Sequence, residues 1–282
     1  MKKGISIWSF TETDLKKIFE IAKAAGFDGV ELGLDETGPV SLSSTKEQIL
    51  EVKKLAEEIG IELYSVASGL YWTYNYTSNK EENRIKVKDI TKKHHQVASW
   101  LGCDTILVVP GAVEVPFDPQ SEIVEYDVAY ERALEALKEL APLAEELKVS
   151  IGVENVWNKF LLSPMEMRDF IDKVGSDYVG SYFDVGNVLY AGYPEQWIKI
   201  LGKRIKKVHF KDYRKAVGTI DGFVDLLAGD VDYIAVKKAF DEIGYDGWAT
   251  AEMIPPYKLY PETIIYNTSN AMDKILGRKG TC

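Results

Sequence analysis

Short runs of β-branched and other apolar residues alternate along this chain with longer amphipathic stretches, and the pair recurs eight times. In the first pair, an apolar run over residues 5–8 is followed by Leu15, Ile18, Phe19 and Ala22, which recur at helical spacing. The later pairs repeat this plan. Regular alternation of strand and helix predicts parallel strands that are connected by right-handed crossovers.

The alternation places eight strands and eight helices along the chain. The strands are expected at residues 5–8, 29–34, 61–67, 105–109, 150–155, 179–184, 205–211 and 248–253. The helices are expected at residues 14–25, 45–59, 82–101, 127–146, 164–174, 194–201, 231–243 and 264–276. This order is compatible with a closed barrel and also with an open doubly wound sheet.

Polar residues near the ends of the last four predicted strands decide between these two folds. They are Glu154, Asp184, His209 and Glu252. An open sheet gathers its ligands at one crevice, whereas groups from four successive strands converge only if the sheet curves. We therefore predict an α/β fold, a (β/α)8 TIM barrel, that forms a single domain over residues 1–282. A length of about 250 residues is usual for such a barrel.

The four residues also predict a metal site. Each has an ordinary explanation on its own, since a carboxylate at a strand end often caps a helix or pairs with a lysine. Three converging carboxylates, however, are costly to bury unless a cation neutralises them. Their hard oxygens and single imidazole suit a divalent metal ion, with Mn²⁺ ahead of Mg²⁺, Co²⁺ or Zn²⁺, and differ from the sulfur-rich ligands of structural zinc.

Composition and charge exclude several classes of partner. The net charge of −10 opposes binding to a phosphate backbone, so we expect no nucleic-acid partner. No apolar run approaches the roughly 20 residues that a bilayer requires, and the first residues lead straight into a strand. We expect a cytoplasmic protein without a membrane partner. Cys103 and Cys282 are the two cysteines, which do not suggest a disulfide framework.

Several motifs resemble those of the xylose-isomerase-like sugar isomerases and epimerases, a family that includes ketose 3-epimerases and pentulose-5-phosphate 3-epimerases. The motifs are Phe-Asp-Val-Gly-Asn at 183–187, Val-His-Phe-Lys-Asp at 208–212, Gly-Asp-Val-Asp at 229–232 and Ile-Gly-Tyr-Asp-Gly-Trp at 243–248. The resemblance covers nearly the whole chain. It implies that Glu154, Asp184, His209 and Glu252 are the metal ligands.

The resemblance also implies an activity, which is epimerisation or isomerisation of a ketose or ketose phosphate. A metal-stabilised enediolate would form by proton transfer, with Glu154 and Glu252 as the catalytic acid and base. Epimerisation and aldose–ketose isomerisation both remain open. The partner is then a small-molecule sugar or sugar phosphate, and the sequence leaves open whether the chain forms a homo-oligomer.

Three other functions are compatible with the scaffold. A keto-inositol dehydratase, which is a lyase, would use the same metal site. A DNA-repair endonuclease of related fold needs a histidine-rich zinc cluster, and the three histidines of this chain cannot supply one, since His94 and His95 are neighbours on a predicted helix and are expected at its surface or in the core. A non-catalytic sugar-binding barrel would leave the two glutamates unexplained.

The residues expected to bind the substrate lie at or beyond predicted strand ends. They are Trp8, Tyr71, Trp72, Asn187 and Lys211. Aromatic faces pack against the C–H groups of a sugar, although core packing is the ordinary role of such rings. The segment 69–76 is unusually aromatic and polar for a connection, which favours a lid or pocket wall. Lys211 is expected to bind a substrate oxygen or phosphate, or to pair with Asp212.

Overall fold

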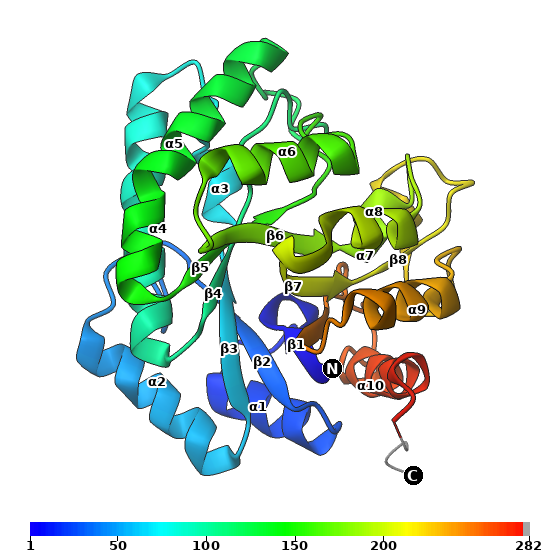
Figure 1. Cartoon of the computed structure of the whole chain (residues 1–282). Coiled ribbons are helices and arrows are strands. Elements are labelled where there is room, and N and C mark those ends of the chain that lie inside the picture. Colours follow the sequence, from blue (N-terminus) through cyan, green and yellow to red (C-terminus); the bar gives the residue numbers. More distant parts are fainter. Residues whose placement is uncertain (279–282) are drawn as a thin grey trace.

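Eight parallel strands close into a barrel in the computed structural model, which describes residues 1–278 (Figure 1). The order around the barrel is β1 (Lys2–Ser6), β10 (Trp248–Ala251), β7 (Ile205–Phe210), β6 (Val179–Asp184), β5 (Ser150–Glu154), β4 (Thr105–Val108), β3 (Glu62–Ala67) and β2 (Gly29–Gly33). Gly4 of β1 pairs with Gly29 on one side and with Thr250 on the other, which closes the sheet. The prediction of a TIM barrel is confirmed, and an open sheet is excluded.

Helices surround this barrel and bury one face against it. The longer ones are α1 (Leu15–Ala24), α2 (Lys46–Ile59), α4 (Glu81–Leu101), α5 (Tyr126–Leu147), α6 (Pro164–Val174), α8 (Pro194–Leu201), α9 (Tyr233–Ile243) and α10 (Glu262–Leu276). The periodic residues of α1 are buried, as their spacing predicts. Helix α2 begins with a capping box between Thr45 and Gln48 and ends at Gly60, whose φ of 78° suits a residue without a Cβ.

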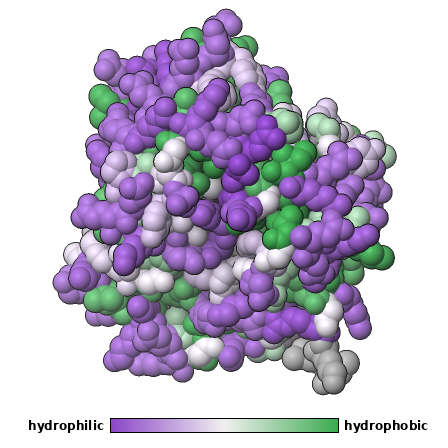
Figure 2. Space-filling model, viewed as in Figure 1, coloured by the Kyte–Doolittle hydropathy of each residue, from purple (hydrophilic) through white to green (hydrophobic). Residues whose placement is uncertain are grey.

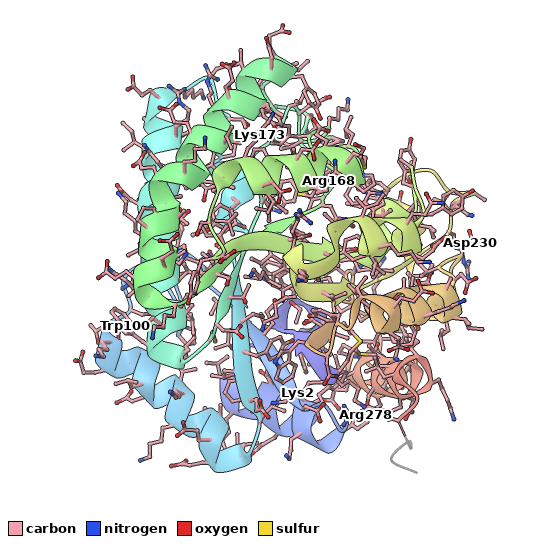
Figure 3. The ribbon with its side chains drawn as sticks, in the orientation of Figure 1. Lys2, Trp100, Arg168, Lys173, Asp230 and Arg278 are labelled. Atoms are coloured by element: carbon pink, nitrogen blue, oxygen red, sulfur yellow. The ribbon has the colours of Figure 1, made fainter. Side chains whose placement is uncertain are left out.

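Charged side chains cover the outside of the molecule. Arg168 and Lys173 lie along α6, and Arg278 follows α10 (Figure 3). The surface is accordingly hydrophilic over most of the view in Figure 2, with a group of hydrophobic side chains over the region of α7 (Val185–Val188) and α8. Within residues 1–278, no helix is both long enough and apolar enough to cross a membrane.

Several strands end earlier than the apolar runs predict. Residues 7–9 form a 3-10 helix, Ile7–Ser9, although a strand is expected through residue 8. The last strand likewise stops at Ala251 instead of residue 253. The reason is the pairing, because Ile5 is the last residue of β1 with a partner in β10, namely Ala251. Beyond that point β1 and β10 no longer pair with each other, although Ser6 still pairs with Glu31 of β2 and the Glu252 N–H still donates to the Phe210 carbonyl of β7.

The connection after β7 contains a small hairpin that the sequence did not reveal. Strands β8 (Asp212–Tyr213) and β9 (Phe223–Val224) pair in antiparallel fashion. Two-residue strands are too short to show a period of two. The buried Asp212 carboxylate anchors the hairpin, since it accepts hydrogen bonds from the backbone N–H groups of Tyr213, Leu227, Gly229 and Val231 at 2.8–3.1 Å.

Candidate metal centre

Neighbouring strands bring the four candidate ligands to the carboxyl end of the barrel. Glu154 and Asp184 are the last residues of β5 and β6, His209 is the penultimate residue of β7, and Glu252 directly follows β10. Strand register places Asp184 opposite His209. One nitrogen or oxygen from each residue lies within 4.8 Å of those of the other three. The sequence therefore located a real cluster of side chains.

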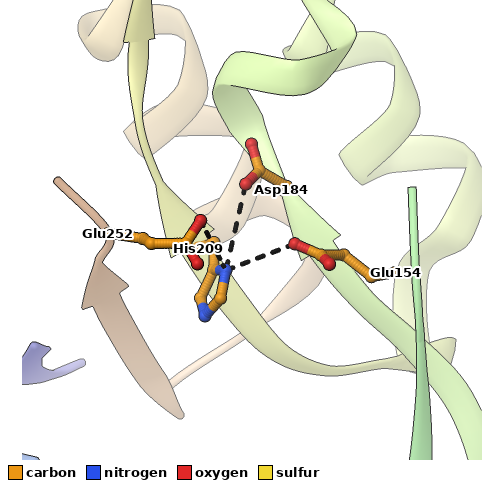
Figure 4. A group of neighbouring side chains, drawn as sticks. All are labelled: Glu154, Asp184, His209 and Glu252. Atoms are coloured by element: carbon orange, nitrogen blue, oxygen red, sulfur yellow. Dashed lines mark ion pairs between the residues drawn. The ribbon is translucent and has the colours of Figure 1, made fainter. Parts of the chain in front are cut away.

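The His209 ring stands at the centre of this cluster. Its Nδ1 atom is 3.3 Å from Glu154 Oε1, 3.7 Å from Glu252 Oε2 and 3.9 Å from Asp184 Oδ2 (Figure 4). All four side chains are buried, with Glu154 the most exposed at 6%. Among the described residues, neither Asp184 Oδ2 nor His209 Nδ1 has a hydrogen-bond partner, although both atoms lie within ion-pair distance of charged neighbours. Buried polar atoms rarely stay unpaired, so the donor set fits a divalent cation that binds both atoms.

Burial and neighbouring charges shift the pKa values of Glu154, Asp184 and His209. Burial is the main factor that raises the pKa of Glu154 to about 7, and the charge of Glu252 adds to it against the opposing effect of His209. Burial likewise raises the pKa of Asp184. Burial disfavours the His209 imidazolium, yet Glu31 and Glu252 outweigh it and hold the pKa of His209 well above its usual range. The cluster thus attracts positive charge.

Lys211 supplies part of that positive charge. Its Nζ atom lies 3.1 Å from Asp184 Oδ2 and also contacts Glu252 Oε2. The expected alternative of a pair with Asp212 is wrong, because the Asp212 carboxylate accepts hydrogen bonds from the backbone of Tyr213 and of the connection that follows β9. Burial opposes the Lys211 ammonium, but Asp184 and Glu252 together hold the pKa of Lys211 above its usual range. Lys211 therefore shares its acceptors with the candidate metal site.

Two asparagines hold Asp184 in place. The Asn155 side chain donates to the Asp184 carbonyl at 2.8 Å and accepts from the Asp184 N–H at 2.9 Å. The Asn187 N–H donates to Asp184 Oδ1 at 2.8 Å, and the Asn187 amide donates to the Asn155 carbonyl at 3.0 Å. Because Oδ1 is held in this way, Oδ2 faces the cluster. This is the kind of support that orients metal ligands.

A cavity of about 610 Å³ opens above the cluster. Trp8, Trp72, Asn187 and Lys211 line it together with Glu154 and Glu252. Phe117, from the long connection after β4, and Phe223, from the hairpin, complete its walls. A second, mostly apolar cavity of about 650 Å³ adjoins it along Phe117, Val156, Trp157, Asn187 and Ile220. Four of the five side chains expected at the substrate thus border one space.

Tyr71 is the exception. It is fully buried, it does not line the cavity, and its hydroxyl lies 3.0 Å from His94 Nδ1. His94 and His95 are also fully buried. Of the two expected positions, the helix surface and the core, they occupy the core. The loop position of Tyr71 suggested the cavity, but the short helix α3 (Leu70–Thr73) turns Trp72 towards the cavity and Tyr71 away from it. We no longer expect Tyr71 to touch the substrate.

Glu31 is a buried carboxylate beside the cluster that the sequence reasoning missed. It is fully buried in β2, and its Oε1 atom accepts a hydrogen bond from His209 Nε2 at 2.9 Å. A signal was present, because Glu31 interrupts the apolar run Gly-Val-Glu-Leu-Gly at 29–33. Its partner His209, however, lies 178 residues away in the chain, so nothing in the sequence indicated the contact.

The chain also matches a known protein family. The model of a family described as xylose isomerase-like TIM barrel matches residues 19–268. The chain belongs to this family. Its family resemblance is therefore confirmed, and so is the fold that the resemblance implies.

Relatives of this xylose isomerase-like barrel include epimerases and a dehydratase. The Escherichia coli K12 protein SgbU, whose name assigns it provisionally as an L-ribulose-5-phosphate 3-epimerase, is 26% identical over 248 residues, which cover 83% of this chain and 81% of SgbU. D-psicose 3-epimerase of Enterocloster bolteae is 25% identical over 266 residues, with 89% and 82% covered. Inosose dehydratase of Geobacillus thermodenitrificans is 23% identical over 286 residues, with 89% of each chain covered.

A solved structure shows the same fold. The crystal structure of a D-tagatose 3-epimerase-like protein superposes with a TM-score of 0.80 at 22% identity, and the match covers 98% of this chain and 97% of the other. Epimerases and dehydratases are similarly distant from this chain, so the choice between these activities depends on the site.

Proposed function

We propose that this protein is a divalent-metal-dependent epimerase or isomerase of a ketose. The observation that carries the proposal is the placement of Glu154 and Glu252, which approach the centre of the cluster from opposite sides of His209 (Figure 4). Two carboxylates on opposite sides of a bound sugar are the arrangement needed to remove a proton from one face of a carbon and return one to the other. Glu154, with its pKa of about 7, is suited to exchange protons near neutral pH.

Glu154, Asp184, His209 and Glu252 would hold the metal ion, and the hard donor set favours Mn²⁺. A bound divalent ion would polarise the ketose carbonyl as a Lewis acid and so acidify the neighbouring C–H. Other side chains of the protein orient the ligands and enclose the substrate. Asn155 and Asn187 keep Asp184 oriented, and the rings of Trp8 and Trp72 bound the cavity and exclude water from the reacting carbon.

We propose an unphosphorylated ketose ahead of a ketose phosphate. Among the residues that the structure describes, Lys211 is the one basic side chain that lines the cavity above the cluster, and it already contacts Asp184 and Glu252. Lys159, at the adjoining cavity, pairs with Glu114. Phosphate recognition normally uses free Arg or Lys side chains or a helix N-terminus. The apolar and aromatic lining suits sugar C–H groups instead.

The alternative candidate is a dehydratase of a keto-inositol. The similarity to an inosose dehydratase over 89% of both chains favours it, and the same carboxylate pair would then remove a proton and assist the loss of hydroxide. The two functions are separated by the product. Epimerisation or isomerisation conserves the mass of the substrate, whereas dehydration lowers it by the mass of one water molecule.

The test of the proposal is hydrogen exchange at carbon. Manganese-loaded protein is incubated in heavy water with ketopentoses, ketohexoses, their phosphates and keto-inositols, and NMR follows deuterium at the carbon beside the carbonyl. We expect deuterium incorporation with a free ketose and an unchanged product skeleton. A lack of incorporation with every compound would reject the proton-transfer chemistry, and a product that has lost water would establish the dehydratase.

Substitution of the two carboxylates tests their role. Glu154→Gln and Glu252→Gln should each lower turnover by at least about 10²-fold, the range expected for loss of a general acid or base. Glu62→Gln, at the opposite end of the barrel in β3, is the matched control and should retain full turnover. Metal content is measured on every variant, so that a lost ion is distinguished from lost proton transfer. Full activity in either site variant would remove that residue from the mechanism.

We also propose that residues 1–282 form a single domain. The first and last strands of the barrel pair with each other, and Lys3 of β1 forms a buried ion pair of 2.6 Å with Asp273 of α10. The two ends of the described chain therefore depend on each other. Limited proteolysis that released a stable fragment would contradict this proposal.

A further inference from the structure

A charged side chain lies inside the barrel below the metal ligands, where the proposed chemistry does not use it. Glu31 has no solvent exposure, and neither does His209 above it. Burial of a carboxylate is unfavourable unless the group is paired and hydrogen-bonded. Hydrophobic residues usually fill the interior of such barrels. The presence of Glu31 at this position therefore needs a reason.

Both carboxylate oxygens of Glu31 accept hydrogen bonds from side chains on other strands. Oε1 accepts from His209 Nε2 of β7 at 2.9 Å. Oε2 accepts from the Ser65 hydroxyl of β3 at 2.8 Å and from the Tyr182 hydroxyl of β6. The Ser65 and Tyr182 hydroxyls are themselves 3.1 Å apart. The carboxylate is thus fixed in position and orientation by three strands.

The hydrogen bond between Glu31 and His209 determines which imidazole nitrogen carries the proton and which one has a lone pair for a metal ion. An ionised carboxylate has no proton to donate, so it requires the proton of the neutral imidazole to sit on Nε2. Nδ1, which faces Glu154, Asp184 and Glu252, then presents a lone pair. A lone pair on that atom is what a metal ion needs.

We propose that Glu31 is a positioning residue of the metal centre, which holds His209 in the tautomer and orientation that direct Nδ1 at the ion. This inference rests on the proposed metal-dependent function and adds a residue to it. Glu31 does not touch the substrate or the ion. It acts through His209, and Ser65 and Tyr182 act on it in turn.

The informative substitution is Glu31→Gln, which keeps the size of the side chain. The glutamine amide can accept from Nε2 or donate to it, so the choice of tautomer is lost while the barrel stays filled. Tyr64→Phe is the matched control. It also removes a buried polar group from the barrel interior, where the Tyr64 hydroxyl is 2.8 Å from Thr250 Oγ1, but it leaves His209 and Glu31 untouched.

The measurement is metal affinity of the full chain. Protein is stripped with a chelator, Mn²⁺ is titrated calorimetrically, and the visible spectrum of the Co²⁺ form is recorded. The Kd for Mn²⁺ should rise about 10–100-fold in Glu31→Gln, the usual effect of losing the partner of a metal-bound histidine. It should change less than about twofold in Tyr64→Phe. The Co²⁺ spectrum should change in Glu31→Gln alone.

The outcomes are distinguishable. A folded Glu31→Gln variant that binds Mn²⁺ as tightly as the wild type overturns this inference and leaves the proposed function standing. A wild-type protein that binds no divalent ion overturns both. If Glu31→Gln does not fold, Tyr182→Phe replaces it, because this variant removes only one hydroxyl donor to Glu31. It should weaken Mn²⁺ binding severalfold, and an unchanged Kd would overturn the inference.

Discussion

Lys211→Met should destabilise the metal-free protein much more than the metal-bound protein. Lys211 is 16% exposed, lies 3.1 Å from Asp184 Oδ2 and contacts Glu252 as well. At an effective dielectric constant of about 20, one such pair at this distance corresponds to about 5 kcal/mol of attraction. Loss of one member of a buried pair typically costs about 3–5 kcal/mol, because the remaining charge stays buried. Proton uptake by the carboxylates relieves part of this cost.

We therefore expect the free energy of unfolding to fall by about 3 kcal/mol in the presence of a chelator. With saturating Mn²⁺, the ion supplies the missing positive charge, and the loss should shrink to about 1 kcal/mol. The assay is urea unfolding followed by circular dichroism, for wild type and variant, each with chelator and with Mn²⁺. The difference of about 2 kcal/mol between the two losses measures the coupling between Lys211 and the metal site.

Lys207→Met provides the control for this experiment. Lys207 is also a buried lysine of the barrel, with its partner Asp104 at 2.6 Å, but it does not contact the cluster. Its substitution should cost the same amount with and without Mn²⁺. If Lys211→Met also lost equal stability under both conditions, Lys211 and the metal would not share acceptors, and the reasoning would be refuted.

Two further predictions concern proton competition and the hairpin. Burial raises the pKa of Glu154 to about 7, and neighbouring carboxylates hold the pKa of His209 above its usual range, so a metal ion must displace protons from the cluster at low pH. Calorimetry should therefore show Mn²⁺ affinity at least about tenfold weaker at pH 6 than at pH 8. Equal affinity at the two pH values would contradict the assignment. Asp212→Ala leaves four backbone N–H groups without their acceptor, so trypsin should cleave after Arg214 or Lys215 faster than in the wild type. An unchanged cleavage rate would show that other contacts hold the hairpin.

Much of the fold was predictable because its signals are local. The spacing of Leu15, Ile18, Phe19 and Ala22 depends only on the period of one helix, and all four residues are buried. Strand ends were less predictable. The apolar run continues into Ile7, but the strand stops at Ser6, because β10 offers no further partner. The β8–β9 hairpin was not predicted because it also depends on a tertiary contact. Its two-residue strands are held by the Asp212 carboxylate.

The candidate site was predictable where the position of a residue along its strand determines which way the residue faces. Glu154 and Asp184 end their strands, and residues at such ends face the mouth of a parallel barrel. Orientation within loops was not predictable in this way. Tyr71 and Trp72 are adjacent in one short helix, yet Tyr71 is buried and Trp72 lines the cavity.

The sequence by itself determined the number and order of the strand–helix units and the residue that each strand carries to the mouth of the barrel, since both depend on patterns within a few residues. Tertiary structure alone decided which further groups contact them. Glu31 and His209 lie 178 residues apart in the chain and on strands that are not neighbours in the sheet, and only closure of the barrel brings their side chains to 2.9 Å. Lys211 similarly meets Asp184 and Glu252 instead of its neighbour Asp212, because the backbone of the connection that follows β9 donates to the Asp212 carboxylate.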